Sequence, residues 1–212
     1  MATSFADQIP IILWVVTSLK PTRILDVGKG FGKYGFLIHE YYGIDSSLRP
    51  NPKLTLKNQS SVTIDCVDIN TDYAFTHLPD LYSRIIDRDI ATNFKDLTGY
   101  DLILMADVIE HLQKDDGDRL LRFFLASGAN ILVSTPLSFF QQELYGSDSE
   151  HHVSYWSRKD FRNLGCYLSY QNTSSGGVYL LSSAPIRIPG FGNSLSQKIR
   201  RIVRLLLNEL GI

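Results

Sequence analysis

Cysteine is scarce in this chain: of 212 residues, only Cys66 and Cys166 carry a thiol. Two cysteines so far apart do not form a metal-binding spacing, and they cannot build the disulfide framework of a small secreted domain. The sequence therefore predicts a reduced, cytoplasmic protein that does not depend on disulfides.

Long hydrophobic runs and an excess of charge are also missing. The apolar run at residues 9–16 is too short to span a bilayer, and it follows Asp7 rather than a basic segment, so it does not read as a targeting signal. The formal net charge is −1, so no overall field attracts nucleic acid or an anionic membrane. A hydrophobic content of 44% and a charged content of 20% are ordinary for one globular domain with a sizeable core.

The most informative stretch is residues 24–35, ILDVGKGFGKYG. It reads as a short buried strand, a glycine turn and the start of a helix, with an acid, Asp26, near the end of the strand. Glycine at alternate positions lets a ligand approach the main chain, and the helix that follows offers free N–H groups to an anion. The turn consists of Gly28, Gly30 and Gly32. An ordinary strand–turn–helix without a ligand is the plain alternative.

The GxGxG spacing with an acid two residues before the first glycine resembles the first motif of class I S-adenosylmethionine (SAM)-dependent methyltransferases. The resemblance implies that Asp26 and the glycine turn hold the methionine end of SAM. Lys29 departs from the family pattern, because a small residue is usual there. Its side chain either helps to hold the cofactor's carboxylate or points to solvent.

Two further acids are candidates for the rest of the cofactor. The β-branched run at 62–69 predicts a strand with Asp68 at its end, where an acid can accept two hydrogen bonds from ribose hydroxyls. Asp65 is the alternative, but strand alternation puts it on the opposite face. Residues 84–90 predict a third strand ending in Asp89, which the resemblance places at the adenine amino group, with Asp87 or a solvated turn acid as alternatives. Their neighbours Ile69 and Ile90 are assigned to the same cofactor site.

Residues 100–105 form the strongest predicted strand, and ADVIEHL follows at 106–112. A D-x-hydrophobic-E-H-L stretch after the fourth strand is frequent in the same family, which implies that Asp107 lines the cofactor and that the segment faces the substrate. No NPPY or DPPY motif follows the strand, so the planar grip used on nucleic-acid bases is missing. A small-molecule acceptor is therefore favoured over nucleic acid.

The remaining motifs complete an α/β fold. Residues 131–136 predict a fifth strand, the stretch HHVSYWSRKDF at 151–161 resembles the family segment that follows it, and 166–171 with 178–183 predict a closing strand pair. The resemblance implies a Rossmann-like three-layer sandwich with a mostly parallel seven-stranded sheet and an antiparallel last strand. A helix over 4–19 closes over the cofactor or simply packs on the sheet, and long loops at 43–61 and 137–155 select the substrate.

We expect residues 1–185 to form the SAM-binding methyltransferase domain and 186–212 a linker with an amphipathic helix. That helix, over 194–210, has an apolar side beside several basic residues. It packs on its own domain, forms a homodimer contact or attaches weakly to an anionic membrane surface, and the first two are favoured.

The expected chemistry is in-line attack by a substrate oxygen or nitrogen on the methyl group of SAM. His111, His151 and His152 are the candidate bases, with His111 and His151 placed ahead of His152, because imidazole titrates near neutral pH and these residues fall at or above the expected ligand edge. Capping or bracing of loops is their plain alternative. No acid cluster supplies a metal site, so metal-assisted transfer is not expected. Two competing functions are a non-catalytic SAM-binding interaction module and, less favoured by the GxGxG spacing, an NAD(P)-dependent oxidoreductase.

Overall fold

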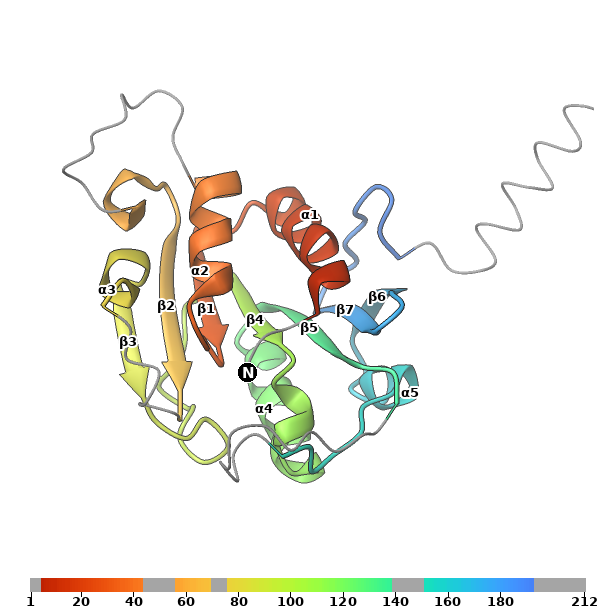
Figure 1. Ribbon diagram of the computed structural model, residues 1–212. Helices are drawn as coiled ribbons and strands as arrows, with labels where there is room; N and C mark the ends of the chain where they lie inside the picture. The colour runs from red at the N-terminus through yellow and green to blue at the C-terminus, as the bar shows by residue number, and fades with distance from the viewer. Residues whose placement is uncertain (1–4, 44–55, 70–75, 139–150, 193–212) are drawn as a thin grey trace, which may run out of the picture.

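The seven predicted strands form one twisted sheet in the order β3-β2-β1-β4-β5-β7-β6 (Figure 1). The computed structural model describes residues 5–43, 56–69, 76–138 and 151–192. Strands β1 to β5 are parallel, and β7 runs antiparallel to both of its neighbours. The predicted fold class is confirmed. The strands are β1 Arg23–Val27, β2 Thr63–Asp68, β3 Arg84–Asp87, β4 Leu102–Ala106, β5 Asn130–Pro136, β6 Tyr167–Asn172 and β7 Gly176–Ser182.

Helices cover both faces of the sheet and make the three layers visible in Figure 1. One face carries α1 (Ile9–Leu19), α2 (Lys33–Ile38) and α3 (Leu78–Leu81), and the other carries α4 (Lys114–Ala126) and α5 (Arg158–Arg162). Short helical turns are η1 Ala6–Gln8, η2 His39–Gly43, η3 Leu56–Gln59 and η5 Ile109–His111. Within the described part of the chain, no helix is both long and apolar enough to cross a bilayer.

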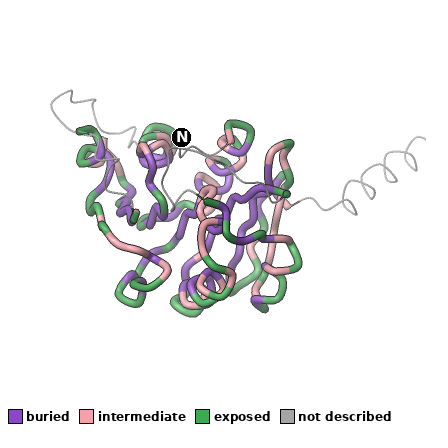
Figure 2. The backbone as a smooth tube through the Cα atoms, turned by 60° about the horizontal axis from the view of Figure 1, so that its bottom comes forward, coloured by how far each residue is buried: buried purple, intermediate pink, exposed green. Residues whose placement is uncertain are grey.

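The central strands are buried on both sides because their side chains alternate between two apolar layers. Along β1, Ile24 packs with the α1–α2 layer, whereas Leu25 and Val27 pack with the α4 layer. Figure 2 shows the buried strands enclosed by exposed helix surfaces and turns. This pattern explains why β4, LILMA, reads as a continuous hydrophobic run in the sequence.

The third strand is shorter than predicted. It ends at Asp87, so Asp89 lies in the turn that follows and not at the end of a strand reaching residue 90. The physical reason is local: the carboxylate of Asp89 accepts a hydrogen bond from the backbone N–H of Ala91 at 2.8 Å. An aspartate that bonds the backbone two residues ahead favours a turn over continued strand pairing.

The chain after β7 returns to the α1 face. Ile188 and Phe191 are buried in the same core cluster as Val15, and the indole N–H of Trp14 donates to the carbonyl of Pro189 at 2.8 Å. The first residues of the predicted linker therefore pack on the domain. The predicted helix over 194–210 lies outside the described residues, as do parts of the two predicted loops (44–55 and 139–150), and all three remain predictions.

Candidate active site

The glycine turn lies at the carboxyl edge of the sheet, between β1 and α2. Gly28, Gly30 and Gly32 have φ values of 72°, 47° and 79°, in the left-handed region that glycine tolerates best. The N–H of Gly28 donates to the carbonyl of Val67 at 2.8 Å, and a Cβ at Gly28 would lie 2.5 Å from a methyl of Val108. Glycine is therefore required for the turn to pack directly on the segment that follows β4.

Asp68 at the end of β2 faces this turn. Its carboxylate accepts a hydrogen bond from the N–H of Gly30 at 3.2 Å and lies 3.5 Å from the ammonium of Lys29. Lys29 is only 7% exposed, so its side chain does not point to solvent. The structure thus brings together three of the residues that the sequence assigned to the cofactor.

Asp65, the alternative to Asp68, has a structural role on the opposite face. Its buried carboxylate accepts hydrogen bonds from the guanidinium of Arg84 at 2.9 Å and from the hydroxyl of Tyr100 at 2.8 Å. Burial and this carboxylate raise the pKa of Tyr100 to about 12. Strand alternation separated the two acids correctly.

Asp26 is buried beneath the glycine turn rather than open at the edge. The hydroxyl of Tyr82 donates to its carboxylate at 2.6 Å. Burial, reinforced by the negative charge of Asp68, raises the pKa of Asp26 to about 7. In this arrangement the Asp26 carboxyl ties β1 to Tyr82, whose ring packs against Gly35 of α2.

Asp107 directly follows β4 and adopts a left-handed backbone with φ 55°. Its carboxylate accepts hydrogen bonds from the hydroxyl of Ser134 at 3.2 Å and from the backbone N–H of Phe5 at 3.3 Å. Burial raises the pKa of Asp107 to about 6. The bond to Phe5 ties the start of the described chain to the end of β4, while helix α1 itself packs on the face of the sheet.

The two predicted isoleucines differ in exposure at this edge. Ile69, just after β2, is 55% exposed, whereas Ile90 is buried in the α4 layer of the core. Asp89 lies beside Ile90 but uses one carboxylate oxygen to cap its own turn. Of these two isoleucines, Ile69 is therefore the one that offers an open apolar surface next to Asp68.

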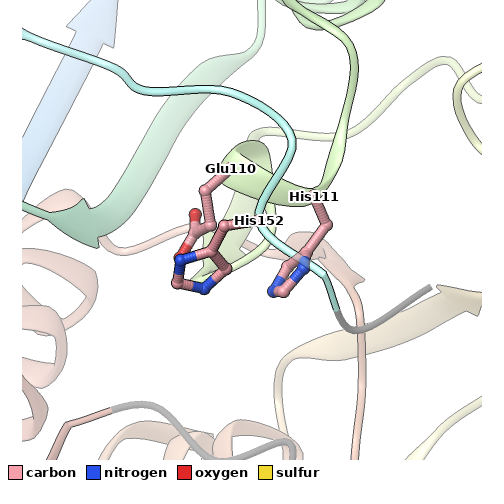
Figure 3. Close-up of side chains that lie close together, drawn as sticks. All are labelled: Glu110, His111 and His152. Atoms are coloured by element: carbon pink, nitrogen blue, oxygen red, sulfur yellow. The ribbon is translucent and has the colours of Figure 1, made fainter. Parts of the chain in front are cut away.

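Two of the three predicted histidines meet a buried acid. Glu110 and His111 lie on η5, and His152 approaches them from the segment after β5 (Figure 3). The rings of His111 and His152 have centroids 4.9 Å apart in an edge-on arrangement. We refer to Glu110, His111 and His152 as the Glu–His cluster. The side chain of His151 is exposed and takes no part, but its carbonyl accepts a hydrogen bond from Nδ1 of His111 at 3.1 Å.

Glu110 is the functional candidate that the sequence interpretation missed. It is 2% exposed, and neither carboxylate oxygen has a hydrogen-bond partner among the described residues. Burial, with the nearby charge of Asp107, raises its pKa well above the usual range, and burial lowers the pKa of His111. The signal was present in the D-x-hydrophobic-E-H stretch, where a glutamate precedes a candidate histidine.

Backbone bonds hold the cluster in place. The carbonyl of Glu110 accepts from the N–H groups of Val153 and Ser154, at 2.9 and 3.0 Å. The hydroxyl of Ser154 in turn accepts from the indole N–H of Trp156 at 2.8 Å. Trp156 stacks on Phe161 in the α4 layer, so the segment bearing His152 is anchored in the core.

No protein-family model and no curated protein sequence matches this chain. Solved structures do match it by fold. An O-methyltransferase family protein from Burkholderia thailandensis is 10% identical, with a TM-score of 0.56 over 85% of this chain and 57% of that protein. The methyltransferase domain of the bacterial protein CtHen1 is 18% identical, with a TM-score of 0.54 over 83% of this chain and 97% of that domain.

A third match carries ligands. The 1,6-didemethyltoxoflavin-N1-methyltransferase of Burkholderia thailandensis was solved with 1,6-didemethyltoxoflavin and S-adenosylhomocysteine bound. It is 13% identical, with a TM-score of 0.55 over 83% of this chain and 78% of that protein. At such identities the likeness concerns the fold. This chain has the fold of class I SAM-dependent methyltransferases, as its sequence motifs predicted.

Proposed function

We propose that this protein transfers the methyl group of SAM to an oxygen or nitrogen of a small-molecule acceptor. The observation that carries the proposal is the convergence of the glycine turn and Asp68 beside the segment that follows β4, at one edge of the sheet. Ligands of open α/β sheets bind at this edge. The binding of S-adenosylhomocysteine in the fold neighbours supports SAM as the cofactor.

The proposed cofactor position follows from the polar groups at the edge. The methionine end lies over Gly28 to Gly32, where backbone N–H groups and the start of α2 favour its carboxylate. Asp68 accepts the ribose hydroxyls, and the ammonium of Lys29 beside it holds that carboxylate in place. The adenine extends toward Ile69, Asp89 and Ile90, and Asp107 borders the methyl group.

The reaction needs an acceptor atom in line with the sulfonium methyl. Holding these two atoms in alignment supplies much of the rate enhancement. A hydroxyl acceptor must also lose its proton. We assign this task to the Glu–His cluster, which lies after β4 at the expected substrate side. His111 and His152 are its imidazoles, and the exposed ring of His151 is left out of the assignment.

A small-molecule acceptor agrees with the net charge of −1 and the missing NPPY-type motif. The bound 1,6-didemethyltoxoflavin of one fold neighbour adds support. Both cysteines are free thiols, which agrees with a reducing, cytoplasmic setting.

Calorimetry with SAM, S-adenosylhomocysteine and NAD tests the cofactor assignment. We expect binding of the first two and much weaker binding of NAD. Transfer of labelled methyl from SAM to a fraction of cell extract then separates an enzyme from a non-catalytic SAM-binding module. Tight NAD binding without SAM binding would refute the proposal.

A further inference from the structure

We propose that the Glu–His cluster binds one divalent transition-metal ion next to the SAM site. One ligand atom each from Glu110, His111 and His152 lies within 4.8 Å of the other two. Figure 3 shows the three side chains gathered between η5 and the segment after β5. Two imidazoles and one carboxylate form a donor set that such ions favour.

The buried state of Glu110 supports a bound cation most directly. Neither oxygen of its carboxylate makes a hydrogen bond of normal distance and angle among the described residues; the hydroxyl of Thr135 lies near it, and the carboxylate of Asp107 lies close enough to repel its charge. Burying a polar group that lacks a partner is costly, so such a group calls for an explanation. A bound dication would offset the burial cost of Glu110 and the repulsion from Asp107 together.

His111 is already oriented as a ligand. Its Nδ1 lies 3.1 Å from the carbonyl of His151, and a carbonyl can only accept, so Nδ1 carries the proton. The lone pair of the neutral ring then lies on Nε2. Histidine ligands of metals usually donate their other ring N–H to a carbonyl or carboxylate in this way.

His152 reaches the cluster on a pinned segment. The next two residues, Val153 and Ser154, donate their N–H groups to the carbonyl of Glu110 itself. One backbone unit thus fixes the acid and the second imidazole relative to each other. A site whose ligands are held in position before the ion arrives loses less entropy on binding.

The donor set selects the class of ion. Imidazole nitrogens suit Fe²⁺, Co²⁺ and Zn²⁺ better than Mg²⁺ and Ca²⁺, which prefer oxygen ligands, and the carboxylate oxygen also admits Mn²⁺. Three protein ligands leave coordination positions open for an acceptor oxygen. The sequence interpretation expected no metal site, because no compact acid cluster is visible along the chain. The fold completes one by bringing His152 to the adjacent pair Glu110 and His111.

The catalytic consequence rests on the proposed function. With their lone pairs on the ion, His111 and His152 would not take the proton themselves. The ion would instead lower the pKa of a bound acceptor hydroxyl, which would release its proton to water, as metal-bound water does. The resulting oxygen attacks the methyl carbon, the new C–O bond forms as the C–S bond breaks, and the electron pair of the C–S bond stays on sulfur. The products are the methyl ether and S-adenosylhomocysteine.

Titration of the untagged, chelator-treated full chain with Co²⁺, followed by its visible absorption, tests the site, and calorimetry with Mn²⁺ and Zn²⁺ tests affinity. We expect one ion per chain. Glu110→Gln and His152→Ala should weaken binding tenfold or more, since even outer partners of a metal site contribute that much. His151→Ala is the matched control: it removes a neighbouring imidazole, keeps the carbonyl that orients His111, and should retain the affinity.

No binding by the wild-type chain overturns the metal site, and so does equal binding by Glu110→Gln and His152→Ala. SAM affinity measured on the same samples reports whether each variant is folded and keeps the two proposals separate. Wild-type protein that binds SAM but no metal refutes only the metal site. Protein that binds metal but not SAM refutes only the methyltransferase proposal.

Discussion

At the scale of single residues, position within a strand decides what each acid does. Asp65 and Asp68 lie on the same strand three residues apart, so they point to opposite faces. Asp65 is satisfied by Arg84 and Tyr100, whereas Asp68 faces the glycine turn. Of the two, Asp68 is therefore the acid that we propose for the cofactor.

This contrast gives a prediction for cofactor affinity. Asp68→Ala should weaken SAM binding by roughly 1.5–3 kcal/mol, the range for hydrogen bonds to a charged group. Asp65→Asn should lower stability through Arg84 and Tyr100 but leave SAM affinity nearly unchanged. Calorimetry with SAM measures both variants, and equal losses of affinity would contradict the assignment of Asp68.

Asp26 predicts a pH dependence of stability. Its pKa is about 7 in the folded chain against a reference of 3.8, mainly through burial. Between about pH 4 and pH 7 the folded state keeps a proton that the unfolded state has released, so stability falls as pH rises through this window. The slope from this group is at most about 1.4 kcal/mol per pH unit.

Asp26→Asn should remove this contribution, because the amide is neutral and its oxygen still accepts from Tyr82. Urea unfolding of the ligand-free protein at pH 5 and pH 8 measures the effect. The variant should gain stability over the wild type as pH increases. A difference that stays constant between the two pH values would show that Asp26 is not held protonated.

At the scale of elements, helix α4 packs against Trp156 and Ile109 at a glycine in its interior, Gly117. A Cβ at Gly117 would lie 2.5 Å from the Trp156 ring and 3.0 Å from a methyl of Ile109. Glycine costs a helix interior about 1 kcal/mol relative to alanine. Here it lets α4 pack closely on the tryptophan that anchors the segment bearing His152.

Gly117→Ala should therefore destabilise the protein despite its better helix propensity, by about 1–3 kcal/mol through overpacking. Trp156→Phe removes the ring atoms that the new methyl would meet. In that background the same alanine should cost less, which a double-mutant cycle from chemical unfolding measures. Additive costs would show that the close contact does not control the packing of α4.

At the scale of the whole molecule, the described N-terminal segment ties distant parts of the sheet together. The N–H of Phe5 donates to Asp107 after β4. The carboxylate of Asp7 accepts hydrogen bonds from Ser174 and Ser175 in the β6–β7 turn, which lowers its pKa to about 2. A ligand at the edge between these points would contact elements from both halves of the chain.

SAM should consequently stabilise the whole fold. At about 100 times its dissociation constant, a ligand specific for the native state adds about 2.7 kcal/mol. For a chain of this size, that corresponds to a rise of roughly 5–10 °C in the unfolding midpoint. Thermal unfolding followed by circular dichroism measures it, with NAD at the same concentration as the control. An equal shift with NAD would point to a different cofactor.

Local patterns determined the elements of this protein. Runs such as Tyr100–Met105 and the alternate glycines act through neighbours in the sequence, so the strands and the turn were predictable. The face of Asp68 followed from the two-residue period of a strand. The end of β3 was predicted too late, because the turn formed by Asp89 competes with strand pairing.

Tertiary structure alone decided which side chains meet. Whether Lys29 faced solvent or Asp68 depended on the packing of β2 against the glycine turn. The hydrogen bond from Tyr82 to Asp26 likewise joins residues that are far apart in the sequence. The sequence placed His151 ahead of His152 as a candidate base. The backbone bonds from Val153 and Ser154 to Glu110 brought the His152 imidazole to the buried acid and left the His151 imidazole outside. Such contacts join segments distant in the sequence, so they depend on how the strands and helix layers pack together.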